Sequence, residues 1–141
     1  MRRELRIGLL ILAALVWAVN EWRAREVAPP PGEATAVEGA WEQRLSGVMV
    51  RFEGTVDRVL ADDDHGSRHQ RFIVRLASGH TVLVAHNIDL AERVPLSLHD
   101  RIGVYGEYEW NDRGGVVHWT HRDPQGRREG GWVEHGGRRY R

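Results

Sequence analysis

The chain has 141 residues, enough for one domain of ordinary size, and its 41% hydrophobic content permits a packed core. Its 20 basic residues balance its 20 acidic residues, which excludes a polyanion binder held by bulk positive charge. Cysteine is absent, which excludes disulfide bonds, thiolate catalysis and cysteine-based zinc sites. Any metal site must therefore use His, Asp or Glu side chains.

The amino terminus has the pattern of a membrane-targeting segment. Three arginines among the first six residues precede an apolar run at residues 7–19. This arrangement keeps the N-terminus in the cytoplasm and sends the following chain across the membrane. Including its flanks, the segment approaches the length of a tilted spanning helix. We expect residues 1–22 to be an uncleaved signal anchor, with a cleaved signal peptide as the alternative. Residues 23–39, rich in Pro, Ala and Glu, are predicted to be a flexible tether to a folded domain at residues 40–141.

The folded domain is predicted to be mainly β. Apolar and polar residues alternate with a period of two from Val48 to Val56, and the alternation slips at Arg58, which indicates a bulge. Between the third and fourth expected strands, Asp89 is predicted to cap a short helix that Pro95 ends. The further strands are expected at residues 71–76, 80–86, 101–110 and 115–121, with a last hairpin at residues 130–140. Three strands, a short helix and two more strands favour a small five- to six-stranded OB-like Greek-key barrel with one short helix, preceded by the N-terminal transmembrane or signal helix.

Four separated motifs resemble, in order, those of the bacterial domain-of-unknown-function 3465 family. They are HQRF at residues 69–72, AHNIDLA at 85–91, GEYEWN at 106–111 and GGVVHWTHRDP at 114–124. The resemblance covers residues 47–140. It implies an OB-like bacterial protein that is membrane-tethered or exported, and it implies no activity. We therefore expect the protein in the cell envelope, on the periplasmic side, anchored in the inner membrane or secreted after signal cleavage.

The hairpin between the last two barrel strands predicts a polar surface. A four-residue turn at residues 111–114 sets Glu107 opposite His118, and a carboxylate beside an imidazole can orient it for ligation or proton transfer. The alternative is a surface pair of little energetic value. The core face is expected to carry Trp119 above Gly106. Five candidate ligand-binding residues are expected on this surface, and two more lie at the end of the third expected strand. They are Tyr105, Glu107, Glu109, His118 and Thr120, followed by His86 and Asp89.

His86 and Asp89 lie where the third strand ends. An outward His86 beside Asp89 is expected to line the same groove, and the alternative is an Asx turn formed by this segment. The acidic loop that contains His65 is a weaker candidate for a hard cation, because its spacing matches no known loop motif and a solvated acidic loop explains it better.

Histidines near acidic residues suggest a divalent metal ion such as zinc. On a flat strand His118 and His121 point to opposite faces, so both reach one ion only if a bulge or strand end intervenes. His121 and Asp123, two apart, are better placed to share a face. The candidate metal ligands are His69, His86, His118, His121 and Asp123.

Nucleic acid is a disfavoured partner. Arginines of the first two strands suit a single-strand groove, but Phe52 and Phe72 fall on the core alternation, so the aromatic stacking platform is missing. The sequence also contains no serine nucleophile elbow, phosphate-binding loop or glycine fingerprint.

Three functions remain open. The preferred one is a membrane-tethered extracytoplasmic OB-like binding module for an oligosaccharide, peptide or protein partner of the envelope. The first alternative is a metal-dependent hydrolase, acting on phosphodiesters, that uses the His/Asp/Glu cluster. The second is a structural accessory of an envelope complex. Whether the protein is an enzyme is left open by the sequence.

Overall fold

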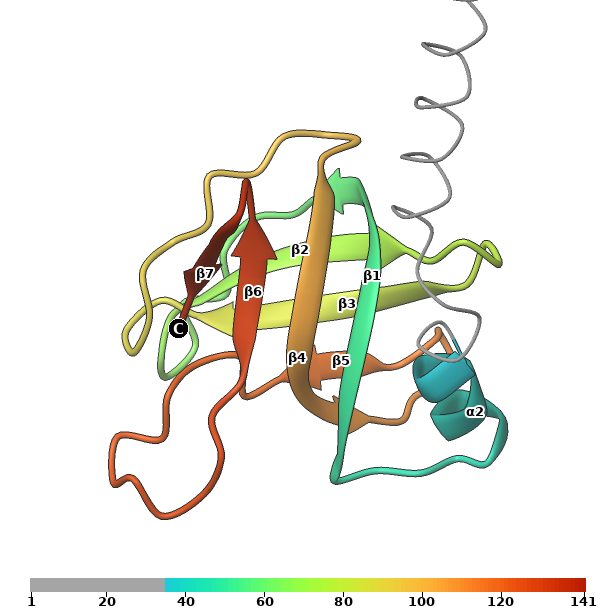
Figure 1. The fold of residues 1–141 in the computed structure, drawn as a ribbon, viewed down its shortest axis with the longest axis horizontal. Coiled ribbons are helices and arrows are strands. Elements are labelled where there is room, and N and C mark those ends of the chain that lie inside the picture. Colours follow the sequence, from blue (N-terminus) through green and yellow to red (C-terminus); the bar gives the residue numbers. More distant parts are fainter. Residues whose placement is uncertain (1–34) are drawn as a thin grey trace, which may run out of the picture. The chain divides into compact units, whose positions relative to one another are not determined.

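The computed structural model describes residues 35–141, so the predicted anchor at residues 1–22 lies outside the described residues, as does most of the predicted tether. Within residues 35–141 no helix is long and apolar enough to cross a membrane. The elements, shown in Figure 1, are α2 (Thr35–Glu42), β1 (Val48–Val59), β2 (His69–Arg75), β3 (Thr81–Asn87), β4 (Arg101–Glu109), β5 (Val116–His118), β6 (Trp132–His135) and β7 (Arg138–Tyr140).

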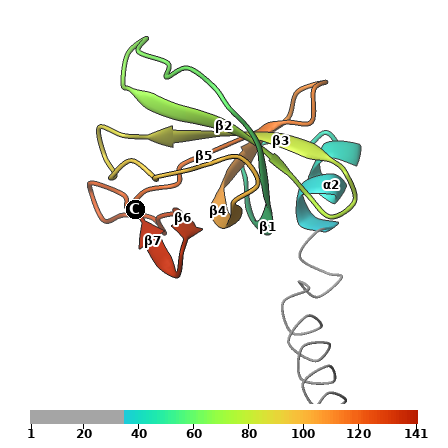
Figure 2. The same ribbon diagram turned by 90° about the horizontal axis from the view of Figure 1, so that it is seen from above.

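Five strands close into a barrel. The strands are ordered β1-β2-β3-β5-β4-β6-β7, and an additional β1–β4 pairing joins the first strand to the fourth. β3 and β5 run parallel, whereas the other pairs are antiparallel. In both ribbon views β2 and β3 cross the direction of β1 and β4 (Figures 1 and 2). The predicted OB-like Greek-key barrel is confirmed, and β6 and β7 form the predicted last hairpin.

β1 is long enough to belong to both crossing layers. Its first part pairs with β4, from Val48 opposite Tyr108 to Thr55 opposite Arg101, and its last part pairs with β2. The register of β1 against β2 shifts between Val56 and Arg58, which is the bulge that the sequence predicts. Because a bulge adds local twist and bend, it lets one strand turn from one layer into the other.

The barrel interior is filled by the residues that the alternation predicts. Phe52, Phe72, Val84, Val104 and Tyr108 are all fully buried. The two phenylalanines therefore contribute to the core and offer no exposed ring for stacking bases, as the sequence predicts.

The helix that the structure describes, α2, lies before the barrel instead of between β3 and β4. In α2, Val37 and Ala40 join the core, so the packed part of the chain begins within the stretch expected to be a tether. Reciprocal bonds hold α2 against the end of β4, because the Trp41 indole donates to the carbonyl of Asn111 (3.1 Å) and the Trp110 indole donates to the carbonyl of Trp41 (3.0 Å).

The short helix that Asp89 was predicted to cap and Pro95 to end is not formed, since turns and irregular chain follow Asn87, the last residue of β3. The Asn87 side chain accepts a bond from the Asp89 amide (3.0 Å), which is the Asx turn considered above. The Gln70 side chain then satisfies both backbone groups of Val94, at 2.8 and 3.0 Å. Val94 precedes Pro95, and a residue before proline disfavours helical backbone angles. Because Gln70 bonds both backbone groups of Val94, these groups need no helical partner.

β4 and β5 approach closely at Gly106. A Cβ atom there would overlap the carbonyl oxygen of His118 and lie 2.8 Å from Val117 Cγ1 and 2.9 Å from Thr120 Cγ2. Trp119, which was expected above Gly106, is half-buried and does not belong to the core cluster. Its φ of +56° ends the strand alternation, so Thr120 takes the interior position instead.

We expect Gly106→Ala to lower the free energy of unfolding by about 1–3 kcal/mol, because the added methyl group overpacks the β4–β5 contact. Gly103→Ala is the matched control on the same strand, since its Cβ would lie 3.4 Å from the nearest atom, in the Trp132 ring. Urea denaturation followed by circular dichroism measures both. Equal destabilisation of the two variants would contradict the role given to Gly106.

Candidate functional site

Two carboxylates and one imidazole gather on the outer surface of β4 and β5. Glu107 and Glu109 are two residues apart on β4 and therefore point to the same side of the sheet. His118 ends β5 directly opposite Glu107, which confirms the predicted register, while Glu109 lies opposite Val116. We call these three residues the Glu-His cluster.

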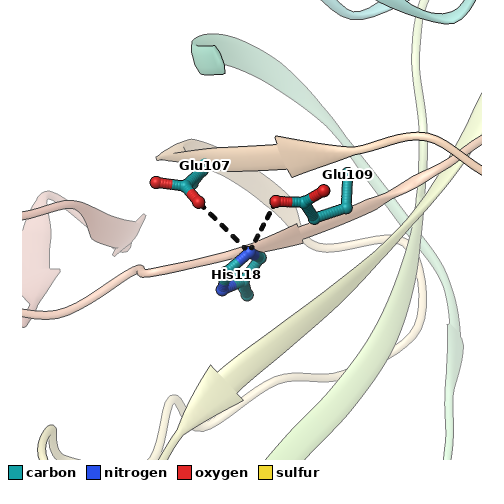
Figure 3. Close-up of side chains that lie close together, drawn as sticks. All are labelled: Glu107, Glu109 and His118. Atoms are coloured by element: carbon teal, nitrogen blue, oxygen red, sulfur yellow. Dashed lines mark ion pairs between the residues drawn. The ribbon is translucent and has the colours of Figure 1, made fainter. Parts of the chain in front are cut away.

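The three side chains converge on one point, as Figure 3 shows. His118 Nε2 lies 3.7 Å from Glu107 Oε1 and 3.5 Å from Glu109 Oε1. One ligand atom from each residue falls within 4.8 Å of the other two. Among residues 35–141, no other group of three His, Asp or Glu side chains meets this condition.

Arg128 reaches the cluster from the loop between β5 and β6. Its Nη2 contacts Glu107 Oε2, and its guanidinium carbon lies 4.2 Å above the centre of the Trp119 ring. The second oxygen of Glu107 is thus held by Arg128 while the first faces His118. Sequence reasoning missed Arg128, because it lies in an irregular loop where no periodicity predicts the direction of a side chain.

Asp123 organises that loop. Its carboxylate accepts backbone bonds from Gln125 (3.0 Å), Arg127 (2.8 Å) and Arg128 (3.0 Å), and these bonds lower the pKa of Asp123. The predicted metal ligand therefore holds the loop that carries Arg128.

Tyr105 lies on the same face of β4 as Glu107, nearer β6. Its hydroxyl donates to Glu129 Oε2 at 3.0 Å, and its ring centre lies 6.0 Å from that of Trp132. Partial burial and the bond to Glu129 raise the pKa of Tyr105. Tyr105 is thereby connected to the same β5–β6 loop that supplies Arg128.

His86 and Thr120 lie in the interior, so the prediction that they face outward is wrong. Both are 0% exposed, and His86 Nδ1 lies 2.7 Å from Thr120 Oγ1. His86 Nε2 is 3.0 Å from the carbonyl of Glu92, which can only accept a bond, so this nitrogen carries the proton and Thr120 donates to Nδ1. Burial lowers the pKa of His86 and keeps the ring neutral.

The other predicted residues have partners elsewhere. Asp89 pairs with Arg68 Nε (2.9 Å), and bonds to Arg68 lower the pKa of Asp89. His69 Nδ1 lies 2.8 Å from the carbonyl of Ser67, and His121 Nδ1 lies 2.7 Å from that of Arg122. Of the five predicted metal ligands, only His118 belongs to the Glu-His cluster.

A pocket of about 300 Å³ opens beside the cluster, over β2, β3 and the β4–β5 turn. Its floor includes Ile73 and Leu83, which are directly opposite each other. Leu83 is in turn opposite Val116 of β5, which is opposite Glu109, so one cross-strand row joins the pocket to the cluster. We call this the strand-2/3 pocket; its lining residues are Leu60, Arg71, Ile73, Thr81, Val82, Leu83, Asn111, Arg113 and Gly115.

Because burial lowers the pKa of His86 in the folded chain, the unfolded chain binds a proton first as pH falls. The stability contributed by neutral His86 is complete well above about pH 6.5 and is lost as pH falls below that value toward the folded pKa. We expect His86→Gln to reduce the slope of unfolding free energy against pH between about pH 7.5 and 5, measured by urea titration. His65→Gln, which changes a fully exposed ring, is the control and should keep the wild-type slope. An unchanged slope in His86→Gln would contradict this account.

The comparisons agree with the motif resemblance. A family model described as "Protein of unknown function (DUF3465)" matches residues 23–141. None of the curated proteins matches the chain significantly. The match spans most of the sequence and includes the barrel, the Glu-His cluster and the loop that carries Arg128. The chain therefore belongs to the DUF3465 family of proteins of unknown function.

Proposed function

We propose that this protein is a membrane-tethered extracytoplasmic binding module whose ligand site is the strand-2/3 pocket. The observation that carries the proposal is the position of this pocket on the barrel. It lies over β2 and β3 and against the β4–β5 turn, and OB folds bind extended ligands on this strand face and its adjoining loops.

The pocket walls are fixed before a ligand arrives. Ile73 and Leu83 belong to paired strands, and the Asn111 side chain accepts bonds from the amides of Arg113 (2.9 Å) and Gly115 (2.8 Å), which set the shape of the turn. Arg71 Nε donates to the carbonyl of Ala61 at 3.0 Å, which holds the guanidinium at the pocket edge. Preformed walls reduce the entropy lost on binding.

The lining favours a peptide segment with an apolar and an acidic side chain. Leu60, Ile73 and Leu83 provide apolar contact, while Arg71 and Arg113 provide positive charge. None of the described residues that line the pocket is aromatic. A ligand that binds by stacking, such as single-stranded nucleic acid, finds no platform there. The apolar and basic lining therefore favours a peptide segment of a protein partner in the envelope over single-stranded nucleic acid.

A larger pocket, of about 440 Å³, lies between the β5–β6 loop and β7. Most of its lining residues belong to that loop, including Asp123 and Glu129. Both of these carboxylates bond within the domain, to loop amides and to Tyr105 respectively. The strand-2/3 pocket is the better candidate because paired strands hold its floor.

The location proposed for the module rests on residues 1–22, where arginines precede the apolar run. We expect a reporter enzyme that is active only outside the cytoplasm to be active when fused after Arg141. We also expect the membrane fraction to contain the chain with its N-terminus intact by mass spectrometry. Deleting residues 5–22 should abolish both results, because it removes the predicted anchor. An inactive fusion of the full chain contradicts the location, and a shortened mature chain contradicts the retained anchor.

The pocket itself can be tested in cells by replacing Thr81 or Arg113 with a photo-crosslinking amino acid. We expect both positions to form the same adduct, and we expect Leu83→Asp to abolish it because a carboxylate replaces the apolar floor. A crosslinker at Leu98, which is exposed and does not line the pocket, is the control. Mass spectrometry of the adduct distinguishes a peptide from a saccharide. Absence of an adduct at both pocket positions, or an equal yield at Leu98, contradicts the proposal.

A further inference from the structure

We infer that the Glu-His cluster binds one divalent transition-metal ion of the zinc type, through Glu107, Glu109 and His118. This inference is independent of the ligand pocket proposed above. It rests on the spacing of the three ligand atoms, on their chemistry, on the charge around them and on their access to solvent.

The spacing fits ligands of one ion better than a hydrogen-bonded triad. His118 Nε2 is 3.7 and 3.5 Å from the two carboxylate oxygens, longer than the 2.7–3.2 Å of an N–H···O hydrogen bond. Two ligands bound to a tetrahedral ion at about 2.0–2.1 Å are separated by about 3.3 Å. All three ligand atoms lie within 4.8 Å of one another, so rotation of the side chains toward the centre of the cluster brings them to this separation.

The donor set selects the class of ion. One imidazole nitrogen with two carboxylate oxygens is a combination that zinc accepts, whereas an all-oxygen set favours calcium or magnesium. Three protein ligands leave a fourth position for water or for an oxygen atom of a bound molecule.

The charges of the Glu-His cluster favour the binding of a cation between its side chains. Two carboxylates share the cluster, and Arg128 binds only the far oxygen of Glu107. Glu109 has no arginine partner among residues 35–141. A histidine must be neutral to bind a metal, so in the metal-binding form the three ligands and Arg128 carry one net negative charge, which a divalent ion offsets. Arg128 also fixes the Glu107 carboxylate, the role of an outer-shell partner at a metal site.

The Glu-His cluster is accessible to solvent, and its side chains are carried by paired strands. The side chains of Glu107, His118 and Glu109 are 17%, 38% and 43% exposed, so an ion can enter from solvent. Glu107 and His118 are fixed by the β4–β5 register, and Glu109 follows on the same strand face. Ligands on paired strands are held more rigidly than ligands on a loop.

The test uses the full chain in detergent micelles, without a histidine tag, stripped by chelator and then titrated with Zn²⁺ against a chromophoric zinc indicator. We expect one equivalent to bind. His118→Ala and Glu109→Gln should each weaken the affinity by about tenfold or more, because the first removes a ligand nitrogen and the second replaces a charged carboxylate with a neutral amide. Co²⁺ should give visible absorption bands in the wild type that both variants lose.

Two control variants separate this site from nonspecific binding. His65→Ala changes an exposed His–Asp pair at a distant loop, and Glu53→Gln changes an exposed glutamate that pairs with Arg101. Both should keep the wild-type zinc affinity. Glu109→Gln is nearly isosteric and half-exposed, so it remains informative even if His118→Ala fails to fold. No saturable binding, binding that persists in Glu109→Gln, or binding lost equally in His65→Ala would overturn the inference and leave the cluster as an ion-pair network.

Discussion

The absence of a side chain at Gly106 is the constraint on which the barrel and its outer surface both depend. β4 pairs with β1, β5 and β6, so any displacement of it propagates through most of the sheet. At Gly106 the carbonyl of His118 and the side chain of Val117 occupy the space that a Cβ would need. This close approach seats Val117 in the core and, one residue along each strand, holds Glu107 opposite His118 on the outside. The packing inside the barrel and the geometry of the cluster therefore both depend on the same close contact between β4 and β5.

The same region contains two histidines in opposite environments. His86 faces inward from β3, where Thr120 and the carbonyl of Glu92 satisfy both ring nitrogens and burial keeps the ring neutral. His118 faces outward between two carboxylates. Among the described residues no buried side-chain nitrogen or oxygen lacks a partner. The interior imidazole therefore has a structural role, because both of its nitrogens are bonded, while the exterior imidazole faces two carboxylates at 3.5 and 3.7 Å and is partly exposed to solvent.

Regular features were predictable from sequence, and features set by single backbone angles or distant bonds were not. The alternation in β1 and β2 was enough to predict the two buried phenylalanines and the bulge. The four-residue hairpin turn was enough to predict that Glu107 lies opposite His118. Alternation failed after His118, because the positive φ of Trp119 exchanges the inward and outward positions. The helix expected in the β3–β4 segment is replaced by turns that depend on Gln70, 24 residues before Val94. Arg128 could not be assigned either, since only the folded loop brings it to Glu107.

The two proposed sites lie within reach of one extended ligand. The row from Ile73 through Leu83 and Val116 to Glu109 crosses four neighbouring strands, which is about 14 Å at the usual strand spacing. An extended peptide covers that distance with about four or five residues. An apolar side chain in the strand-2/3 pocket and an oxygen atom on the open position of the metal could then belong to the same molecule. Binding at two linked points raises affinity without new contacts at either, because the second contact forms at a high effective concentration. On this argument the metal ion would act as an anchor for the ligand, and the barrel needs no hydrolytic activity to explain why the cluster and the pocket lie side by side.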